Sequence, residues 1–224
     1  MNQKEHWEKV YTSRQPHEVG WYEPHLRTSL TWIGDLSLPK DARIIDVGGG
    51  ASTLVDDLLN EGYQQVAVLD LSQAALSVVR TRLGWDAARV MWLEGDITSI
   101  ELPTNFFDLW HDRAVLHFLT EPDGRRKYLD CLRKALKPGG RAIIGTFSPE
   151  APPRCSGLPV ERYTIKAMQE LLDREFTLER HHKELHITPG GTEQMYLYCQ
   201  WQRAANHQIR QTCDPQGGSP ADDL

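Results

Sequence analysis

Short apolar runs alternate with amphipathic helical segments through most of the chain from Arg43 onward. Helical segments carry apolar residues at i, i+3 and i+4, whereas the runs between them are short and continuous. This order is expected when parallel strands are joined by crossover helices, so it predicts a doubly wound α/β fold. The predicted strands are 43–47, 65–70, 90–93, 107–110 and 141–147, and the predicted helices lie around 54–59, 72–83, 122–136 and 165–172.

The C-terminal part has a different pattern. Residues 176–187 and 193–201 read as extended segments, and between them lies Thr188-Pro189-Gly190-Gly191-Thr192, a turn-forming sequence. We therefore expect a final antiparallel pair of strands. Residues 204–224 have no periodic apolar face, and the sequence predicts a disordered tail there.

The first forty residues contain two helical stretches and several aromatic side chains. Leu26, Leu30 and Ile33 recur at helical spacing behind Pro24, which is suited to a helix start. We expect residues 1–40 to form a helical cover over the binding site of one domain, residues 41–203.

Length and composition agree with one globular domain. The chain has 224 residues, of which 40% are hydrophobic and 25% charged, which is near the average for soluble domains. The sequence lacks a long apolar run and the order typical of a signal peptide, so we expect a cytoplasmic protein without membrane association. A net charge of -6 disfavours nucleic acid as a partner.

The four cysteines are widely spaced and include no CxxC pair. This spacing is typical of free thiols in a reducing compartment, and it predicts neither a disulfide framework nor a bound metal. Cys155 and His186 lie near late turns, where a nucleophile or metal ligand is conceivable. Without ligand spacing around them, we interpret both as lid or turn residues.

A glycine-rich turn and a distant carboxylate point to a nucleotide-like ligand. The turn reads Asp46-Val47-Gly48-Gly49-Gly50 and follows the first predicted strand, where missing side chains let a ligand approach the backbone. Asp70 ends the second strand, twenty residues beyond Gly50, and suits the ribose hydroxyls of an adenosine. The two signals together predict an adenosine compound.

The choice between adenosine compounds depends on the residues around the glycines. The dinucleotide pattern GxGxxG requires a third glycine where this chain has Thr53. Asp46 ahead of the glycines would repel a pyrophosphate and attract an ammonium group. These residues disfavour a nicotinamide-dependent oxidoreductase.

The turn and its spacing resemble the first motif of the class I S-adenosylmethionine-dependent methyltransferases. That resemblance implies a seven-stranded, mostly parallel sheet with an antiparallel last strand and helices on both faces. It also implies S-adenosylmethionine as methyl donor, S-adenosylhomocysteine as product, and no metal. The donor-binding residues it implies are Asp46, Gly48, Gly49, Gly50, Ser52, Asp70, Leu71, Gly95, Asp96, Ile97 and His111.

Each donor contact has an expected place. The turn residues would line the methionine part, Asp70 the ribose, Leu71 the adenine face, and Gly95-Asp96-Ile97 the adenine ring and its amino group. Ser52 departs from the family, many members of which have glycine there; it either weakens binding or caps the helix. His111, where the family's methionine pocket has its wall, is alternatively a half-buried polar residue.

The acceptor site is expected after the fourth strand, at the carboxyl edge of the sheet. Asp112 and His117 are candidate bases, and Arg113 can hold an acceptor anion; all three are candidate catalytic residues. Asp112 and Arg113 alternatively cap a helix and pair with charges. Trp21, Tyr22 and Arg113 are the candidate substrate-binding residues, because an aromatic ring can stack on the acceptor or enclose a sulfonium.

Three functions remain open at this level. The first is methyl transfer to a small molecule by in-line displacement. Residues 111–114 lack the Pro-Pro-aromatic sequence of base N-methyltransferases, whereas the Asp112-Arg113 pair is similar to one in some protein lysine methyltransferases. A protein side chain, lysine in particular, is therefore an alternative acceptor. A non-catalytic module that binds the donor to regulate a partner is the third.

Overall fold

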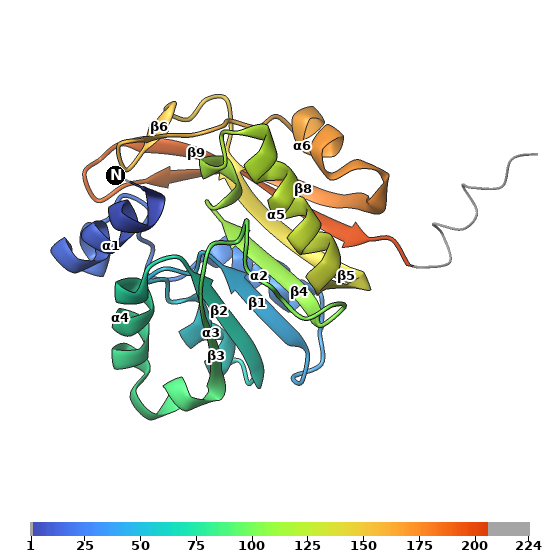
Figure 1. The fold of residues 1–224 in the computed structure, drawn as a ribbon, viewed down its shortest axis with the longest axis horizontal. Helices are drawn as coiled ribbons and strands as arrows, with labels where there is room; N and C mark the ends of the chain where they lie inside the picture. The colour runs from blue at the N-terminus through green and yellow to red at the C-terminus, as the bar shows by residue number, and fades with distance from the viewer. Residues whose placement is uncertain (1, 206–224) are drawn as a thin grey trace, which may run out of the picture.

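The computed structural model describes residues 2–205 and is built around a single seven-stranded sheet (Figure 1). The strand order is β3-β2-β1-β4-β5-β9-β8, and β9 is antiparallel to both of its neighbours. This confirms the predicted doubly wound sheet with its antiparallel last strand. The strands are β1 (Arg43–Val47), β2 (Gln65–Asp70), β3 (Val90–Glu94), β4 (Phe107–Arg113), β5 (Leu136–Phe147), β8 (Phe176–Ile187) and β9 (Glu193–Arg203).

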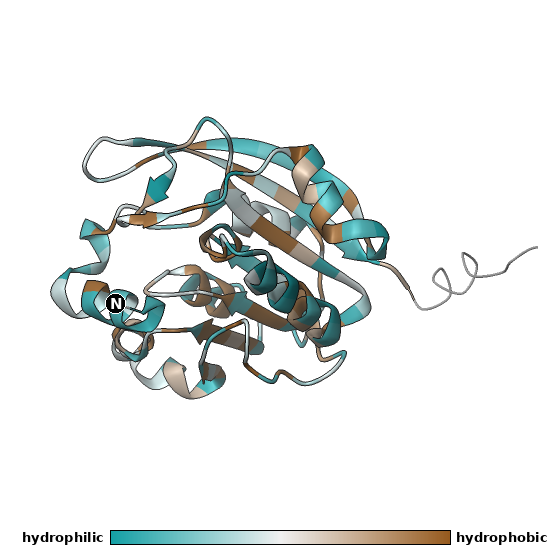
Figure 2. Cartoon of the chain, turned by 45° about the horizontal axis from the view of Figure 1, so that its top comes forward, coloured by the Kyte–Doolittle hydropathy of each residue, from teal (hydrophilic) through white to brown (hydrophobic). Residues whose placement is uncertain are grey.

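Helices cover both faces of this sheet. One hydrophobic cluster joins the sheet to α5 and α6, and a second joins the opposite face to α2, α3 and α4. Hydrophobic segments are concentrated in the central strands, whereas α5 turns a hydrophilic face outward (Figure 2). The helices are α1 (Gln3–Ser13), α2 (Arg27–Asp35), α3 (Leu54–Asn60), α4 (Gln73–Leu83), α5 (Pro122–Ala135) and α6 (Ile165–Leu172).

Local sequence signals account for most of these boundaries. Ser72 caps α4 by accepting from the Ala75 N–H, and Gly84 ends it. The predicted strand starting at Arg141 in fact starts at Leu136, because the chain runs from α5 directly into β5. The region 148–159, expected as a loop, contains the short pair β6 (Arg154–Cys155) and β7 (Leu158–Pro159).

The two N-terminal helices lie on different parts of the domain. Trp32 and Ile33 of α2 pack into the core beside α3, while α1 lies against α4 near the carboxyl ends of β1 and β2 (Figure 1). The carboxyl ends of β1 and β4 meet where the strand order reverses, which is where open α/β sheets bind ligands. The predicted helical stretches are therefore present, and α1 lies beside this edge.

Within residues 2–205, no helix combines the length and hydropathy needed to cross a membrane. The predicted disordered tail falls almost entirely on residues 206–224, outside the described residues. Cys131, Cys155 and Cys199 are free thiols, and Cys213 also lies outside the described part of the chain.

Candidate functional site

The glycine turn after β1 is tightly enclosed. Gly48 has φ +66°, a region that favours glycine, and a Cβ atom there would lie 1.9 Å from a methyl carbon of Val115. Gly49 has little more room, since its added Cβ would lie 2.8 Å from Oδ2 of Asp46. The glycines thus let the turn fit between β1, β2 and the segment after β4.

Asp70 is tied to this turn as its spacing predicts. Its Oδ2 accepts from the Gly50 N–H at 2.8 Å, and its Oδ1 accepts from the Ser72 N–H at 2.8 Å. Burial raises the pKa of the Asp70 carboxyl to about 6, although these N–H groups stabilise the carboxylate. A buried carboxylate held by backbone donors suits a ligand that offers further hydroxyl donors.

Asp46 forms a buried chain with His111 and Ser29. His111 lies opposite Asp46 in the parallel pairing of β1 with β4, so their side chains share a face of the sheet. The Nδ1 atom of His111 lies 2.7 Å from Oδ1 of Asp46, and its Nε2 atom lies 2.8 Å from the Ser29 hydroxyl. Both His111 nitrogens therefore have partners, which fixes the ring at the wall expected for a methionine pocket.

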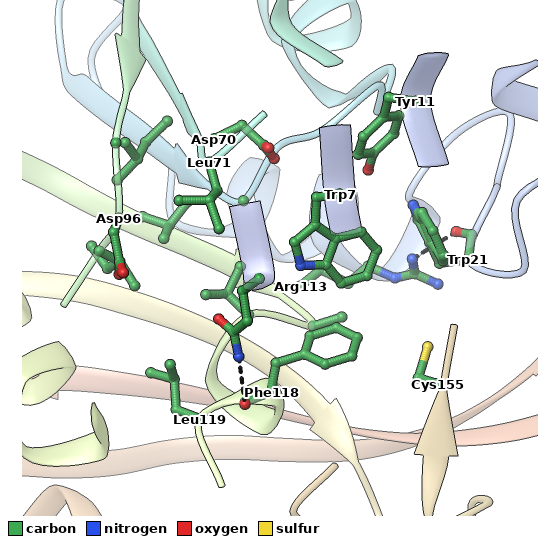
Figure 3. Close-up of a pocket in the computed structure, with 18 residues that line it drawn as sticks. Trp7, Tyr11, Trp21, Asp70, Leu71, Asp96, Arg113, Phe118, Leu119 and Cys155 are labelled. Carbon is green, nitrogen blue, oxygen red and sulfur yellow. Dashed lines mark hydrogen bonds between the residues drawn. The ribbon is translucent and has the colours of Figure 1, made fainter. Parts of the chain in front are cut away.

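A first cavity of about 790 Å³, including its open mouth, lies at the carboxyl edge of the sheet (Figure 3). Asp70 and Asp96 lie toward one side of it, and the rings of Trp7, Trp21 and Phe118 toward the other. Six predicted donor-binding residues line it: Gly48, Asp70, Leu71, Gly95, Asp96 and Ile97. Asp96 is exposed, and its Oδ1 accepts from the Thr98 N–H and hydroxyl.

A second cavity of about 480 Å³ adjoins the first. It is lined by five predicted donor-binding residues, Asp46, Gly48, Gly49, Ser52 and His111, and by the three predicted substrate-binding residues Trp21, Tyr22 and Arg113. Trp21, Gly48 and Arg113 line both cavities, so the two meet there. Gly50 lines neither cavity and contributes its N–H to Asp70.

Asp112 and His117 line neither cavity. The Asp112 carboxylate accepts from the Val115 and Leu116 N–H groups and from the Tyr128 hydroxyl, and burial raises its pKa to about 6. His117 Nδ1 accepts from the Phe147 N–H, and burial lowers the pKa of His117 to about 3. The catalytic roles of Asp112 and His117 stay predictions. Their hydrogen bonds favour a role in positioning the chain segment after β4.

Arg113 does line the site, and only 6% of its side chain is exposed. Its Nε–H donates to the Tyr198 hydroxyl, its Nη1–H to the Trp21 carbonyl and its Nη2–H to Glu23 at 3.4 Å. The guanidinium also lies 4.4 Å from the centre of the Tyr196 ring. Arg113 therefore holds the segment before α2 against the sheet while facing both cavities.

Sequence reasoning predicted that residues 1–40 cover the site, but it did not identify which side chains of α1 line it. Trp7 and Tyr11 line the first cavity from α1, and the added Cβ of Gly50 would lie 2.3 Å from the Tyr11 hydroxyl. Their i, i+4 spacing places them on one helix face, but no local signal says what that face covers. Phe118 and Cys155 also line this cavity.

His186 lies outside both cavities, because its Nδ1 lies 2.9 Å from Glu23 and its Nε2 lies 2.7 Å from the Gly20 carbonyl oxygen. The contacts agree with the interpretation of His186 as a residue that fixes a turn. Among residues 2–205, no group of three or more His, Cys, Asp or Glu side chains is arranged to hold a metal ion.

Comparison with known families decides between the nucleotide-binding classes. Residues 44–140, which carry the glycine turn, Asp70, Asp96 and the segment after β4, match the model of a methyltransferase domain family. Residues 44–140 of this chain thus form a methyltransferase domain. The resemblance found in the sequence is thereby confirmed, and the oxidoreductase alternative loses its support.

Curated relatives of this methyltransferase domain act on different acceptors. The demethylmenaquinone methyltransferase of Clavibacter sepedonicus is 38% identical over 106 residues, which are 47% of this chain and 41% of that protein. The eEF1A lysine and N-terminal methyltransferase of Bos taurus is 25% identical over 139 residues, which are 62% of this chain and 20% of that protein. The matches thus span less than half of either relative.

Solved structures extend the likeness of the fold over nearly the whole chain. A protein solved in work on conversion of a disulfide bond into a thioacetal group during echinomycin biosynthesis has a TM-score of 0.71 at 18% identity, covering 97% of this chain and 100% of that one. The 1,6-didemethyltoxoflavin-N1-methyltransferase of Burkholderia thailandensis, solved with S-adenosylhomocysteine, has a TM-score of 0.63 at 22% identity, covering 87% and 81%.

Proposed function

We propose that this methyltransferase uses S-adenosylmethionine and that the donor spans the two adjoining cavities. The observation that carries this proposal is the glycine turn fixed to Asp70 at the junction of those cavities. The adenosine would occupy the first cavity, with Asp70 accepting from the ribose hydroxyls and Asp96 near the adenine. The methionine part would occupy the second cavity, where the Asp46 carboxylate attracts its ammonium group.

This placement puts the sulfonium where the cavities meet, because the sulfur joins the two halves of the donor. Trp21, Gly48 and Arg113 line both cavities at that point. Transfer is a direct displacement, in which the acceptor forms a bond to the methyl carbon as the carbon–sulfur bond breaks. The product left behind is S-adenosylhomocysteine.

We propose a small molecule as the acceptor. Rings from α1 and from the segment before α2 close over the cavity, with Trp7 and Trp21 centroids 5.4 Å apart. An enclosed aromatic site suits a compact ligand better than an extended chain. Transfer to a protein lysine is one alternative, and the likeness to an eEF1A lysine methyltransferase supports it. A regulatory module that binds the donor without turnover is the second alternative. Cytoplasmic location stays a prediction.

Calorimetry with S-adenosylmethionine, S-adenosylhomocysteine and NAD in one buffer tests donor use. Binding of the first two and not of NAD is the expected result, and binding of NAD alone would overturn the proposal. Release of S-adenosylhomocysteine in the presence of an acceptor panel then separates an enzyme from a regulatory module. Preference for a lysine peptide over every small molecule would favour the protein acceptor.

A further inference from the structure

The wall of the first cavity away from Asp96 has a distinctive chemistry, and at one end its Tyr11 hydroxyl reaches the glycine turn beside Asp70. It consists of the rings of Trp7, Tyr11, Trp21 and Phe118, which we call the aromatic wall, together with Cys155 and Arg113 (Figure 3). Neighbouring ring centroids in the aromatic wall lie 5.0 to 6.5 Å apart. Arg113 is the charged side chain of this wall.

General bases are missing from this wall. Asp112 and His117 have their contacts elsewhere, and burial raises the pKa of the Cys155 thiol to about 11, so the thiol stays protonated near neutral pH. Tyr11 is also protonated, because burial raises its pKa well above the usual value. A thiol or hydroxyl acceptor that reacts as its anion against this wall therefore loses its proton to solvent rather than to one of these side chains.

The charges at the site favour an anion over a cation. Arg113 donates three of its five N–H groups, and within residues 2–205 the other two have no hydrogen-bond acceptor. Glu23, its nearest carboxylate, lines only the second cavity. A bound donor adds the positive sulfonium, so an ammonium between the two cations is repelled and an anion is attracted.

The two carboxylates that line the first cavity, Asp70 and Asp96, lie on the side where we place the adenosine, and the other titratable groups around Arg113 are neutral or face the second cavity. Burial raises the pKa of Tyr196 and Tyr198, which stay neutral, and burial keeps His117 neutral as well. Glu23, whose pKa is lowered by hydrogen bonding to His186 and by Arg113 despite its burial, remains ionised on the side of the second cavity.

We propose, on the basis of the proposed methyl transfer, that the acceptor is a small thiol that reacts as its thiolate against the aromatic wall, with Arg113 as the residue that selects it. A thiol ionises near pH 8.5, whereas hydroxyls ionise far higher and amines are cationic at neutral pH. Sulfur also makes favourable contacts with aromatic rings.

The reaction balances without any further reagent. The thiol releases its proton to solvent, and the thiolate sulfur then forms a bond to the donor methyl carbon while the carbon–sulfonium bond breaks. The products are a methyl thioether and S-adenosylhomocysteine, both uncharged at sulfur. The negative charge of the thiolate and the positive charge of the sulfonium neutralise each other as the transition state forms. Apolar surroundings favour this neutralisation more than water does.

The test uses four compounds that share one ring and differ in the nucleophile: phenylmethanethiol, phenylmethanol, phenylmethanamine and phenylacetate. After subtraction of the uncatalysed rate, kcat/KM for the thiol should exceed that for each of the others by at least about a hundredfold. A faster reaction of the amine, of the alcohol, of the carboxylate or of a lysine peptide would overturn the thiol proposal.

Arg113 is tested through the pH dependence of kcat with the thiol, which reports ionisation in the bound complex. Arg113→Met should move the half-maximal pH upward by about one unit or more, and Arg113→Lys should move it less. Arg180→Met is the matched control, since Arg180 lies over Trp32 beside Asp35 and lines neither cavity. An unchanged pH profile in Arg113→Met would overturn the selecting role.

Calorimetry separates this proposal from the proposed function. Failure to bind S-adenosylmethionine would overturn methyl transfer itself, and the thiol proposal with it. Normal donor binding without methylation of any thiol would overturn only the acceptor class. A large loss of donor affinity in Arg113→Met, with an unchanged pH profile, would instead assign Arg113 to the donor carboxylate.

Discussion

Asp46 and His111 form a buried pair, with 2.7 Å between Oδ1 of the carboxylate and Nδ1 of the ring. Oδ2 of Asp46 lies on the turn side, near Gly49 at the edge of the second cavity. The register of β1 and β4 places Asp46 beside His111, and the pair lies at the end of the site where we place the donor's amino acid group.

Asp46→Asn should weaken donor binding selectively. The asparagine keeps the shape of the side chain but loses the charge that attracts the ammonium group. A hydrogen bond to a charged group contributes about 1.5–3 kcal/mol, so affinity for S-adenosylmethionine should fall by roughly ten- to a hundredfold. Calorimetry with 5′-methylthioadenosine, which lacks the amino acid group, provides the control and should change by less than about threefold. Equal losses for both ligands would contradict this placement.

Asp70 predicts a pH dependence of adenosine binding. Burial raises its folded-state pKa to about 6, above the ordinary value of 3.8, so the protonated form is more populated at mildly acidic pH in the folded protein than in the unfolded chain. Protonation therefore contributes stability below pH 3.8 that is lost as pH rises through 6, whereas ribose binding requires the carboxylate. Affinity for 5′-methylthioadenosine should fall by roughly tenfold between pH 7 and pH 5.

Asp70→Asn is the control for this titration. The variant should bind 5′-methylthioadenosine weakly, with an affinity that is flat across the same range. If the affinity of the natural protein is equally flat while Asp70→Asn does not bind, the carboxylate contacts the ribose but does not titrate between pH 5 and pH 7, which would contradict the predicted pH dependence. Unchanged affinity in Asp70→Asn would remove Asp70 from the donor site.

The variant Asp112→Asn distinguishes a positioning role of this residue from a catalytic one. Because its carboxylate caps the Val115 and Leu116 N–H groups and accepts from Tyr128, Asp112→Asn should lower the free energy of unfolding by about 1–3 kcal/mol. Donor affinity should be unchanged, and kcat below the melting temperature should fall by less than about tenfold. A loss of a thousandfold in kcat at normal stability would restore the catalytic prediction.

Strand periodicity explains which site residues the sequence could identify. The turn after β1 and Asp70 lie at predictable ends of local elements, and their contact follows from adjacent parallel strands. Alternation along β4 also separates His111 and Arg113, which line the second cavity, from Asp112, which packs against Tyr128. Strand alternation in the sequence alone is therefore enough to place Asp112 on the face of β4 opposite His111 and Arg113.

The contribution of α1 could not be predicted in the same way. Tyr11 reaches the glycine turn, and Trp7 reaches Phe118, only because α1 lies against α4. This placement depends on Glu8, which accepts from the Ser72 hydroxyl and the Ala74 N–H across 64 and 66 residues of sequence. Helical spacing indicates an apolar face, but it does not specify a partner so distant in the chain.

Glu8→Ala should therefore loosen α1 from the site. Loss of its contacts with Ser72 and Ala74 removes hydrogen bonds to a charged group, and donor affinity should fall by roughly three- to tenfold. Hydrogen exchange in residues 3–13 should become faster. Lys4→Met removes the exposed pair of α1 with Glu94 and should have little effect on either measurement. Equal effects of the two variants would contradict the role of Glu8.

Gly50→Ala tests the contact between α1 and the glycine turn, with Gly84→Ala as its matched control. Both glycines have positive φ, +53° and +57°, so an alanine should introduce backbone strain at each. A Cβ at Gly50 would lie 2.3 Å from the Tyr11 hydroxyl, whereas nothing lies within 4 Å of one at Gly84. Chemical denaturation should show a loss of stability in both variants, while donor affinity should fall only in Gly50→Ala. In the double variant Gly50→Ala/Tyr11→Phe, loss of the Tyr11 hydroxyl oxygen removes the nearest clash with the new Cβ atom. The double variant should therefore recover part of the donor affinity that Gly50→Ala loses. No recovery would mean that the strained turn, rather than the displacement of Tyr11, weakens binding.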